Sequence, residues 1–358
     1  MAYSLEQMIG QMVIVGFRSP YLAADSPILR SIREHGISGV YLTDNDKPWG
    51  SGLGNIVSPS QFSRLNHTLQ QQRRESGNPW PLFITMDAEG GIIIRLKEKY
   101  GFPATLSAFE LGRQDQPELT RRQSDQIAQL LASSGVNFNF VPVLDLNINP
   151  ANPAIGAKQR SFSDDPERVV RHAVEVIQAH HDHNILCCAK HFPGHGSAPH
   201  DTHLGMVDCS RFWSEKELIP YRRLIERRIL DAVMISHLYN RKLDPDYPAT
   251  LSRRHITGLL RDQLGFEGLI ISDDISMGAL HNYYSYQKTI ELALNAGIDI
   301  LLHSNVSFYQ PDLGQQIVHI VRNLVETGRV RPEIIETAFR RIIVYKQNFY
   351  RPAKHSIN

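Results

Sequence analysis

Short, continuously apolar runs alternate along this chain with longer segments that have helical spacing. Eight apolar runs occur, at 12–17, 39–42, 82–86, 138–144, 185–189, 232–235, 269–271 and 298–302. Their unbroken content of Val, Ile and Leu is typical of parallel strands buried on both faces, and not of strands with one face in water. The pattern therefore predicts eight parallel strands.

The segments between these runs predict amphipathic helices at 58–76, 117–134, 164–181, 214–228, 252–264, 286–295, 312–327 and 332–348. Two helix starts are well marked. Asp164-Asp-Pro-Glu167 places acids and a proline in a first turn, and Ser214-Glu-Lys-Glu217 matches a capping box. Strand and helix alternating eight times predict an α/β fold, a single (β/α)8 TIM barrel, with a doubly wound sheet as the second possibility.

Domain organisation follows from the absence of a compositional break. No Pro-, Ser- or Gly-rich linker divides the chain, so we expect one catalytic domain over residues 1–358 and no second domain. Two long loops, at 43–57 and 147–163, are candidate lids.

Composition narrows the class of protein. The 358 residues are 42% hydrophobic and 21% charged, which provides for a large core and argues against disorder. Lys and Arg number 38 against 37 Asp and Glu, and the net charge of +1 argues against a nucleic-acid partner. Three cysteines cannot form a disulfide framework, the apolar segment at 9–17 lacks the flanks of a signal peptide, and no apolar run reaches the roughly 20 residues of a membrane span. We therefore expect a cytoplasmic protein without membrane association, a monomer or weak dimer.

Titratable residues gather where the predicted strands end. A carboxylate after a strand is often only the cap of the next helix, so no single position is diagnostic. In a (β/α)8 barrel, however, function lies at the carboxyl ends of the strands, and the set as a whole predicts an active site there. The strand-end residues are Asp87, Asp145, Lys190, His191, His237, Asp273, Asp274 and His303.

Several of these positions carry a family resemblance. Lys190-His-Phe-Pro-Gly-His-Gly196, followed by Asp201-Thr-His203, resembles the signature of the bacterial β-N-acetylglucosaminidases of glycoside hydrolase family 3. Further matching segments are Ile271–Met277, Asp87-x-Glu-Gly-Gly91, Ile155-Gly156, Arg160-Ser-Phe162, Pro248–Ser252, Leu264-Gly-Phe266 and Ala296-Gly-x-Asp299, so the likeness extends from about Ile9 to Leu302.

The resemblance implies roles for individual residues. Asp273 matches the nucleophile, and Asp201 and His203 match a dyad in which the carboxylate holds an imidazole that acts as acid and then base. An imidazole suits that role because its ordinary pKa lies near 6.5. Asp87, Arg160, Lys190 and His191 match the residues that hold the sugar hydroxyls, Asp274 is expected to cap the next helix, and His237 matches less specifically.

The implied activity is that of a retaining exo-β-N-acetylglucosaminidase, a β-N-acetylhexosaminidase that removes N-acetylglucosamine from cell-wall muropeptides during peptidoglycan recycling. No cofactor and no metal are implied. Three departures leave the aglycone preference open: Ile92 stands where relatives carry Arg, although Arg95 follows; Ser163 stands where they carry Gly; and 42–45 lacks their usual residues.

Alternative functions stay open at this point. A phosphorylase would use the same dyad to deliver phosphate instead of water, and another β-glycosidase specificity is possible. A dense group of histidines favours a metal-dependent amidohydrolase, although no His-x-His follows the first strand. A barrel that only binds sugar is the non-catalytic alternative. The histidines concerned are His180, His181, His183, His191, His195, His200 and His203.

Overall fold

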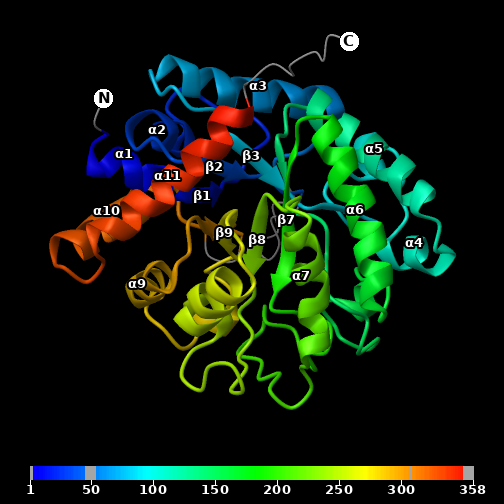
Figure 1. Ribbon diagram of the computed structural model, residues 1–358. Coiled ribbons are helices and arrows are strands. Elements are labelled where there is room, and N and C mark those ends of the chain that lie inside the picture. The colour runs from blue at the N-terminus through cyan, green and yellow to red at the C-terminus, as the bar shows by residue number, and fades with distance from the viewer. Residues whose placement is uncertain (1–2, 45–53, 307–308, 350–358) are drawn as a thin grey trace, which may run out of the picture.

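The computed structural model describes residues 3–44, 54–306 and 309–349, which fold into a barrel of parallel strands inside a layer of helices (Figure 1). Eight strands form one sheet in the order β10-β1-β2-β3-β6-β7-β8-β9. They are β1 (Val13–Gly16), β2 (Gly39–Tyr41), β3 (Phe83–Met86), β6 (Phe138–Asn139), β7 (Leu186–Phe192), β8 (Ala232–Ile235), β9 (Leu269–Ser272) and β10 (Leu301–His303). A parallel bridge between Ile271 and Ile300 closes the ring, and the predicted (β/α)8 barrel is confirmed.

Each of the eight predicted strands overlaps one observed strand, and the observed strands are almost fully buried. The side chains of Val13, Ile84, Phe138, Ile270 and Leu301 are at most 1% exposed. Parallel strands are sealed on one side by the barrel core and on the other by helices, which explains their unbroken apolar sequence.

The helices surround the barrel. They are α1 (Leu5–Gly10), α2 (Pro27–Glu34), α3 (Pro59–Glu75), α4 (Ala108–Gln114), α5 (Pro117–Ser133), α6 (Pro166–Asp182), α7 (Ile219–Glu226), α8 (Gly278–His281), α9 (Tyr286–Ala296), α10 (Leu313–Glu326) and α11 (Pro332–Phe349). Short 3-10 turns occur at Glu98–Tyr100, Gly156–Lys158, Glu215–Leu218 and Ala249–Leu251. Figure 1 shows α10 and α11 beside the blue N-terminal helix α1, so elements from the two ends of the chain share one side of the barrel.

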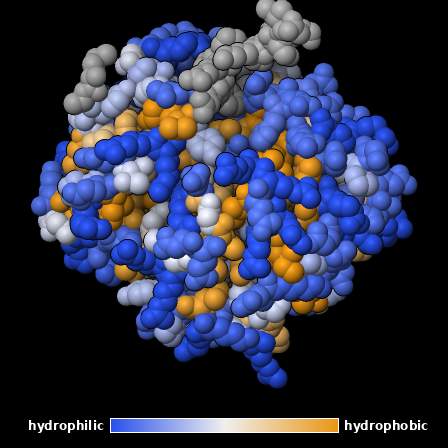
Figure 2. All heavy atoms as spheres, viewed as in Figure 1, coloured by the Kyte–Doolittle hydropathy of each residue, from blue (hydrophilic) through white to orange (hydrophobic). Residues whose placement is uncertain are grey.

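The outer face is amphipathic, as the helical spacing predicts. Figure 2 shows hydrophilic side chains along the helices and hydrophobic groups between them. None of the helices in the described ranges has the length and apolarity needed to cross a bilayer.

Two sequence predictions about helix starts had different outcomes. The first prediction is confirmed: Asp165 is the N-cap of α6, and its side chain accepts a hydrogen bond from the Glu167 N–H at 3.1 Å. The capping box at Ser214 is wrong: Ser214 makes no side-chain cap, and Glu217 turns into the protein interior. The predicted helix at 214–228 is a 3-10 turn followed by α7, and the predicted helix at 252–264 is a π-helix over Arg254–Gln263.

Two loops, at 43–57 and 147–163, are the candidate lids predicted from the sequence. Most of the loop at 43–57 lies outside the described residues. The loop at 147–163 is tied down, since the buried Asn152 side chain donates to the His195 carbonyl at 2.7 Å and the Asn147 N–H donates to the Ser163 carbonyl at 2.9 Å. This loop therefore packs against the 191–203 segment.

Candidate active site

A cavity of about 430 Å³ opens at the carboxyl ends of the strands. Six of the seven site residues predicted from the sequence line it: Asp87, Arg160, Lys190, His191, His203 and Asp273. The seventh, Asp201, lies behind His203 and is hydrogen-bonded to it. The structure thus brings together residues that are separated by up to 186 positions (273 − 87) in the sequence.

Asp201 and His203 form a directed pair. Asp201 Oδ1 accepts hydrogen bonds from His203 Nδ1 at 2.6 Å and from the His203 N–H at 3.0 Å. This bond fixes the imidazole tautomer and leaves Nε2 as the atom that can exchange a proton. Burial lowers the pKa of His203, but the hydrogen bond and charge of Asp201 outweigh it, so the pKa is raised overall. The side chain of His203 is 63% exposed, so the imidazole can exchange protons with solvent.

Replacing Asp201 by asparagine is expected to lower the pKa of His203, because the substitution removes the negative charge that stabilises the imidazolium. The pKa can be followed by NMR titration of the His203 Cε1–H resonance. Lys158→Gln is the matched control of opposite sign, since Lys158 Nζ lies 3.5 Å from Asp201 and its charge lowers the pKa of His203. An unchanged pKa in both variants would contradict this electrostatic coupling.

Asp87 is pinned by cations at the end of β3. Its Oδ1 accepts from Lys190 Nζ at 2.6 Å, and its Oδ2 accepts from Arg95 Nη2 at 3.1 Å and from the Tyr41 hydroxyl at 2.5 Å. Burial alone would raise the pKa of Asp87, but Lys190 and Arg95 hold it well below its usual range. The carboxylate is therefore ionised and held in one orientation.

Glu89 is a site residue that the sequence reasoning missed. Its carboxylate pairs with Arg160 through both oxygens, at 2.9 Å to Nε and 2.7 Å to Nη2, and it also contacts Lys190 Nζ at 2.7 Å. It lies on β4 (Ala88–Gly90), which pairs with β5 (Ile93–Ile94) in a small hairpin. A bidentate pair fixes the guanidinium plane, so Glu89 orients Arg160 toward the cavity.

His191 is held as a neutral imidazole. Its Nδ1 donates to the buried Asp145 Oδ2 at 2.6 Å, and its Nε2 accepts from Arg160 Nη2 at 3.2 Å, because a guanidinium can only donate. Burial and the neighbouring Arg160 charge lower the pKa of His191 well below its ordinary value. Asp145, noted in the sequence only as a strand-end acid, is the group that orients it.

Asp273 and Asp274 follow β9 and differ in their surroundings. Asp273 Oδ1 accepts from the Asp274 N–H at 2.8 Å. Asp274 does not cap α8 as expected: its Oδ1 accepts from the Ser276 N–H and hydroxyl at 3.0 and 2.8 Å, and its other oxygen bonds to Ser304. Its carbonyl accepts from His237 Nε2 at 2.9 Å. Asp274 therefore stabilises the turn that carries Asp273, and the hydrogen bond from His237 stabilises the same turn.

The three departures from the resembled family lie at the margin of this site. Ile92 is 59% exposed at the tip of the hairpin, while Arg95 reaches Asp87 as described. Ser163 is buried at the end of the 147–163 loop. Of the stretch 42–45, Asp44 is buried and paired with Lys97 at 2.5 Å, and Asn45 lies outside the described residues.

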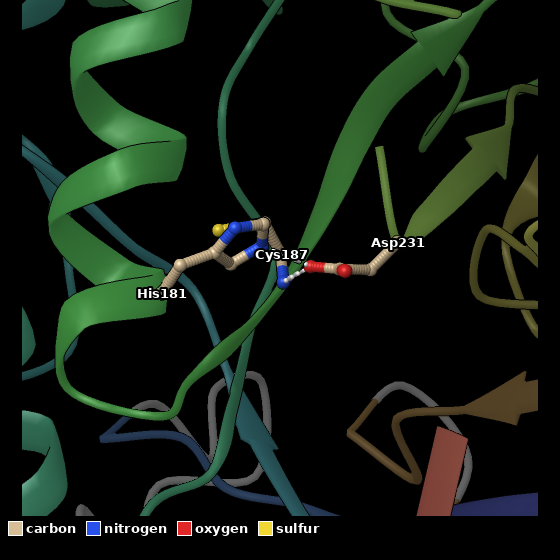
Figure 3. A group of neighbouring side chains, drawn as sticks. All are labelled: His181, Cys187 and Asp231. Carbon is tan, nitrogen blue, oxygen red and sulfur yellow. Dashed lines mark hydrogen bonds and ion pairs between the residues drawn. The ribbon is translucent and has the colours of Figure 1, made fainter. Parts of the chain in front are cut away.

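One group in the described part of the chain has metal-like ligand spacing, and it is remote from the cavity. His181, Cys187 and Asp231 place their donor atoms within 4.8 Å of one another, at the end of α6 and the amino ends of β7 and β8 (Figure 3). His181 Nε2 and the Cys187 N–H both donate to Asp231 Oδ2, at 2.8 and 2.9 Å. This cluster lies at the opposite end of the barrel from Asp273, so it does not bring a metal to the cavity.

Comparison with known proteins agrees with this geometry. The model of the glycosyl hydrolase family 3 N terminal domain matches residues 4–344. A protein named beta-hexosaminidase from Tolumonas auensis is 36% identical over 254 residues, which cover 70% of this chain and 73% of that protein. Another beta-hexosaminidase, from Xanthomonas oryzae pv. oryzae, is 32% identical over 278 residues, covering 75% and 81%.

Solved structures extend the likeness to three dimensions. The glycoside hydrolase family 3 β-N-acetylglucosaminidase of Paenibacillus sp. str. FPU-7 has a TM-score of 0.86 at 30% identity, covering all of this chain and 65% of that chain. The β-N-acetylhexosaminidase of Beutenbergia cavernae DSM 12333 has a TM-score of 0.85 at 27% identity, covering 97% and 99%. On the family match, the relatives and the barrel, the chain belongs to glycosyl hydrolase family 3 and is a glycoside hydrolase.

Proposed function

We propose that this protein is a retaining exo-β-N-acetylglucosaminidase that works by double displacement through Asp273. The observation that carries the proposal is one cavity, in a family 3 barrel, that contains both Asp273 and the paired His203. The relatives named beta-hexosaminidase support the choice of sugar. A cavity bounded on its inner side by the strand ends suits a terminal sugar better than the middle of a chain.

The carboxylates of the cavity wall support Asp273 as the nucleophile. Asp87 is neutralised by Lys190 and Arg95, and both oxygens of Asp274 are engaged by serines. In the described ranges, Asp273 forms no ion pair and accepts its hydrogen bond from a backbone N–H. Its second oxygen is therefore the one that can attack the anomeric carbon.

The His203–Asp201 pair supplies the proton transfers. In the first step, Asp273 forms a bond to C1 while His203 Nε2–H protonates the departing glycosidic oxygen. In the second step, His203 Nε2 takes a proton from water, the water oxygen bonds to C1, and the Asp273 carboxylate leaves. Asp201 holds Nδ1–H throughout. It stabilises the imidazolium that is present before the first step and forms again in the second, and between the steps His203 is neutral.

Sugar binding is assigned to side chains that hydrogen bonds and ion pairs already hold in place. Asp87, Lys190, Arg160 and neutral His191 present acceptors and donors whose geometry is set before substrate arrives, which lowers the entropic cost of binding. We propose further that the single barrel is the catalytic unit and that its substrates are muropeptides with a terminal N-acetylglucosamine, met in the cytoplasm during peptidoglycan recycling.

The test is turnover of nitrophenyl β-N-acetylglucosaminide followed by proton NMR. We expect the β-anomer of N-acetylglucosamine as the first product, and turnover that is unchanged by EDTA. A first-formed α-anomer would exclude double displacement. Sugar 1-phosphate as the main product in phosphate buffer would make the protein a phosphorylase, loss of activity in EDTA would favour a metal enzyme, and sugar binding without turnover would leave a binding barrel. Faster turnover of N-acetylglucosaminyl muropeptide than of chitobiose tests the substrate.

A further inference from the structure

The segment that leads to the Asp201–His203 pair is held at its root by two buried carboxylates. Asp145 accepts from the His195 N–H at 2.7 Å and from the His191 ring at 2.6 Å. Glu217, from the 3-10 turn before α7, accepts from the next two residues: the Gly196 N–H at 3.1 Å, the Ser197 N–H at 3.4 Å and the Ser197 hydroxyl at 2.5 Å. The residues from His195 to Ser197 thus donate hydrogen bonds to two carboxylates that come from separate parts of the chain.

Glu217 is unusual because its carboxyl group is buried without a cation. The residue is 1% exposed, and in the described ranges its hydrogen bonds come from Gly196 and Ser197, not from a Lys or Arg. A buried carboxylate is costly unless its oxygens receive hydrogen bonds, and here the donors come from this one segment. Burial raises the pKa of Glu217 to about 7, although the hydrogen bonds from Ser197 and Gly196 act to lower it. The hydrogen bonds that stabilise this buried carboxyl group therefore come from the segment that precedes His203.

The packing at this root leaves little freedom. Gly194 has a φ of +119°, and a Cβ there would lie 2.5 Å from the Glu217 Cβ. A Cβ on Gly196 would lie 1.7 Å from the Leu146 carbonyl oxygen. Glycine is therefore required at 194 for the close approach to Glu217 and at 196 for the close approach to Leu146. The 3-10 turn also gives up its capping box, because the Glu217 side chain that would complete the box is used here instead.

The root is connected to the dyad by further contacts. His195 Nε2 and the Thr202 hydroxyl lie 3.3 Å apart. At the far end, the Thr202 and His203 carbonyls accept from the N–H groups of Ala279 and Gly278 at 3.2 and 3.3 Å. A shift of the root is therefore transmitted over a few residues to Asp201 and His203.

We propose that Glu217 is a positioning residue for proton transfer, which fixes the root of the 194–203 segment so that Asp201 and His203 stand together at the cavity. Glu217 touches neither the cavity nor the sugar-binding network, so it acts through the segment alone. The inference rests on the proposed role of His203 as the acid and base.

The decisive variant is Glu217→Gln, which keeps the shape but removes the negative charge and leaves one acceptor oxygen in place of two for the three donors of Gly196 and Ser197. We expect kcat/KM for a poor leaving group, such as an alkyl β-N-acetylglucosaminide, to fall about 10- to 100-fold, part of the usual general-acid contribution. The dinitrophenyl glycoside, which needs no protonation on departure, should retain its kcat/KM for the first step. N-acetylglucosamine affinity should be unchanged, because the Asp87 and Arg160 contacts are intact.

Controls separate positioning from folding. Glu215→Gln, exposed in the same 3-10 turn, should behave as the parent protein in every assay. Ser197→Ala, which removes the hydroxyl but keeps the backbone donor, should show a smaller loss of the same kind. Equal losses on both glycosides in Glu217→Gln, no loss at all, or weakened sugar binding would each overturn the proposal.

A measurement without turnover keeps this inference distinct from the proposed function. In Glu217→Gln the NMR-determined pKa of His203 should move down toward its ordinary value, because the Asp201–His203 hydrogen bond loosens. An unchanged pKa would overturn the positioning role even if the enzyme is active. If the pKa moves while His203→Ala shows no leaving-group dependence, the proposed function fails and the structural anchor stands.

Discussion

Replacing Asp273 by alanine is expected to reduce turnover of a nitrophenyl β-N-acetylglucosaminide on the order of 10⁴-fold or more, about 5.5 kcal/mol of transition-state stabilisation. Without the carboxylate, the proposed covalent intermediate cannot form. The other acids near the cavity cannot replace it, since Asp87 is bound by Lys190 and Arg95 and Asp274 by two serines. The measurement is steady-state kinetics on the purified variant, with its melting temperature recorded.

Asp274→Asn is the matched control because it changes the adjacent acid of the same turn. Its oxygens accept from Ser276 and Ser304, so this variant should lose far less activity than Asp273→Ala. Azide added to Asp273→Ala should restore some turnover and yield the α-glycosyl azide, because it attacks from the face that the carboxylate occupied. Near-normal turnover of Asp273→Ala, or a larger loss in Asp274→Asn, would remove Asp273 as the nucleophile.

Much of the fold could be predicted from periodicity. The strands are sealed on both faces, so eight apolar runs marked eight strands, and long helices such as α3, α5 and α6 have enough turns for their spacing to show. The helices that escaped prediction are short: α1 has 6 residues, α2 has 8, α4 has 7 and α8 has 4. About two turns or fewer carry too few apolar positions to define a period.

Local cap motifs gave a mixed signal. Ser4 with Gln7 and Ser107 with Glu110 form true capping boxes at α1 and α4, and both could have been read from the sequence. Ser214 with Glu217 has the same spacing but forms none. The difference is tertiary: the donors of Gly196 and Ser197 draw the Glu217 carboxylate inward, and no local pattern records them.

The candidate site was predicted as far as strand ends and a signature could specify it. All seven predicted residues meet in the structure, because the carboxyl ends of parallel strands converge on one end of the barrel. The supporting groups were missed. Glu89 was quoted only as part of a motif, and its partner Arg160 lies 71 positions away, a pairing that only the hairpin geometry reveals.

His203→Ala is expected to divide substrates by their leaving groups. For alkyl or disaccharide substrates, kcat/KM should fall about 10²- to 10⁴-fold, because the departing oxygen is no longer protonated. For the dinitrophenyl glycoside kcat/KM should change little, while kcat falls because water lacks its base in the second step. The glycosyl-enzyme should then accumulate and appear as a pre-steady-state burst.

Azide separates His203 from Asp273 as well. An anion needs no general base, so azide should restore kcat of His203→Ala on the dinitrophenyl glycoside and yield the β-glycosyl azide, the opposite anomer from that formed by Asp273→Ala. His200→Ala, an exposed histidine three positions away in the same segment, is the control and should leave both substrates unaffected. Equal losses on good and poor leaving groups would mean that proton transfer belongs to another residue, and the Asp201 carboxylate would then be only a structural partner of His203.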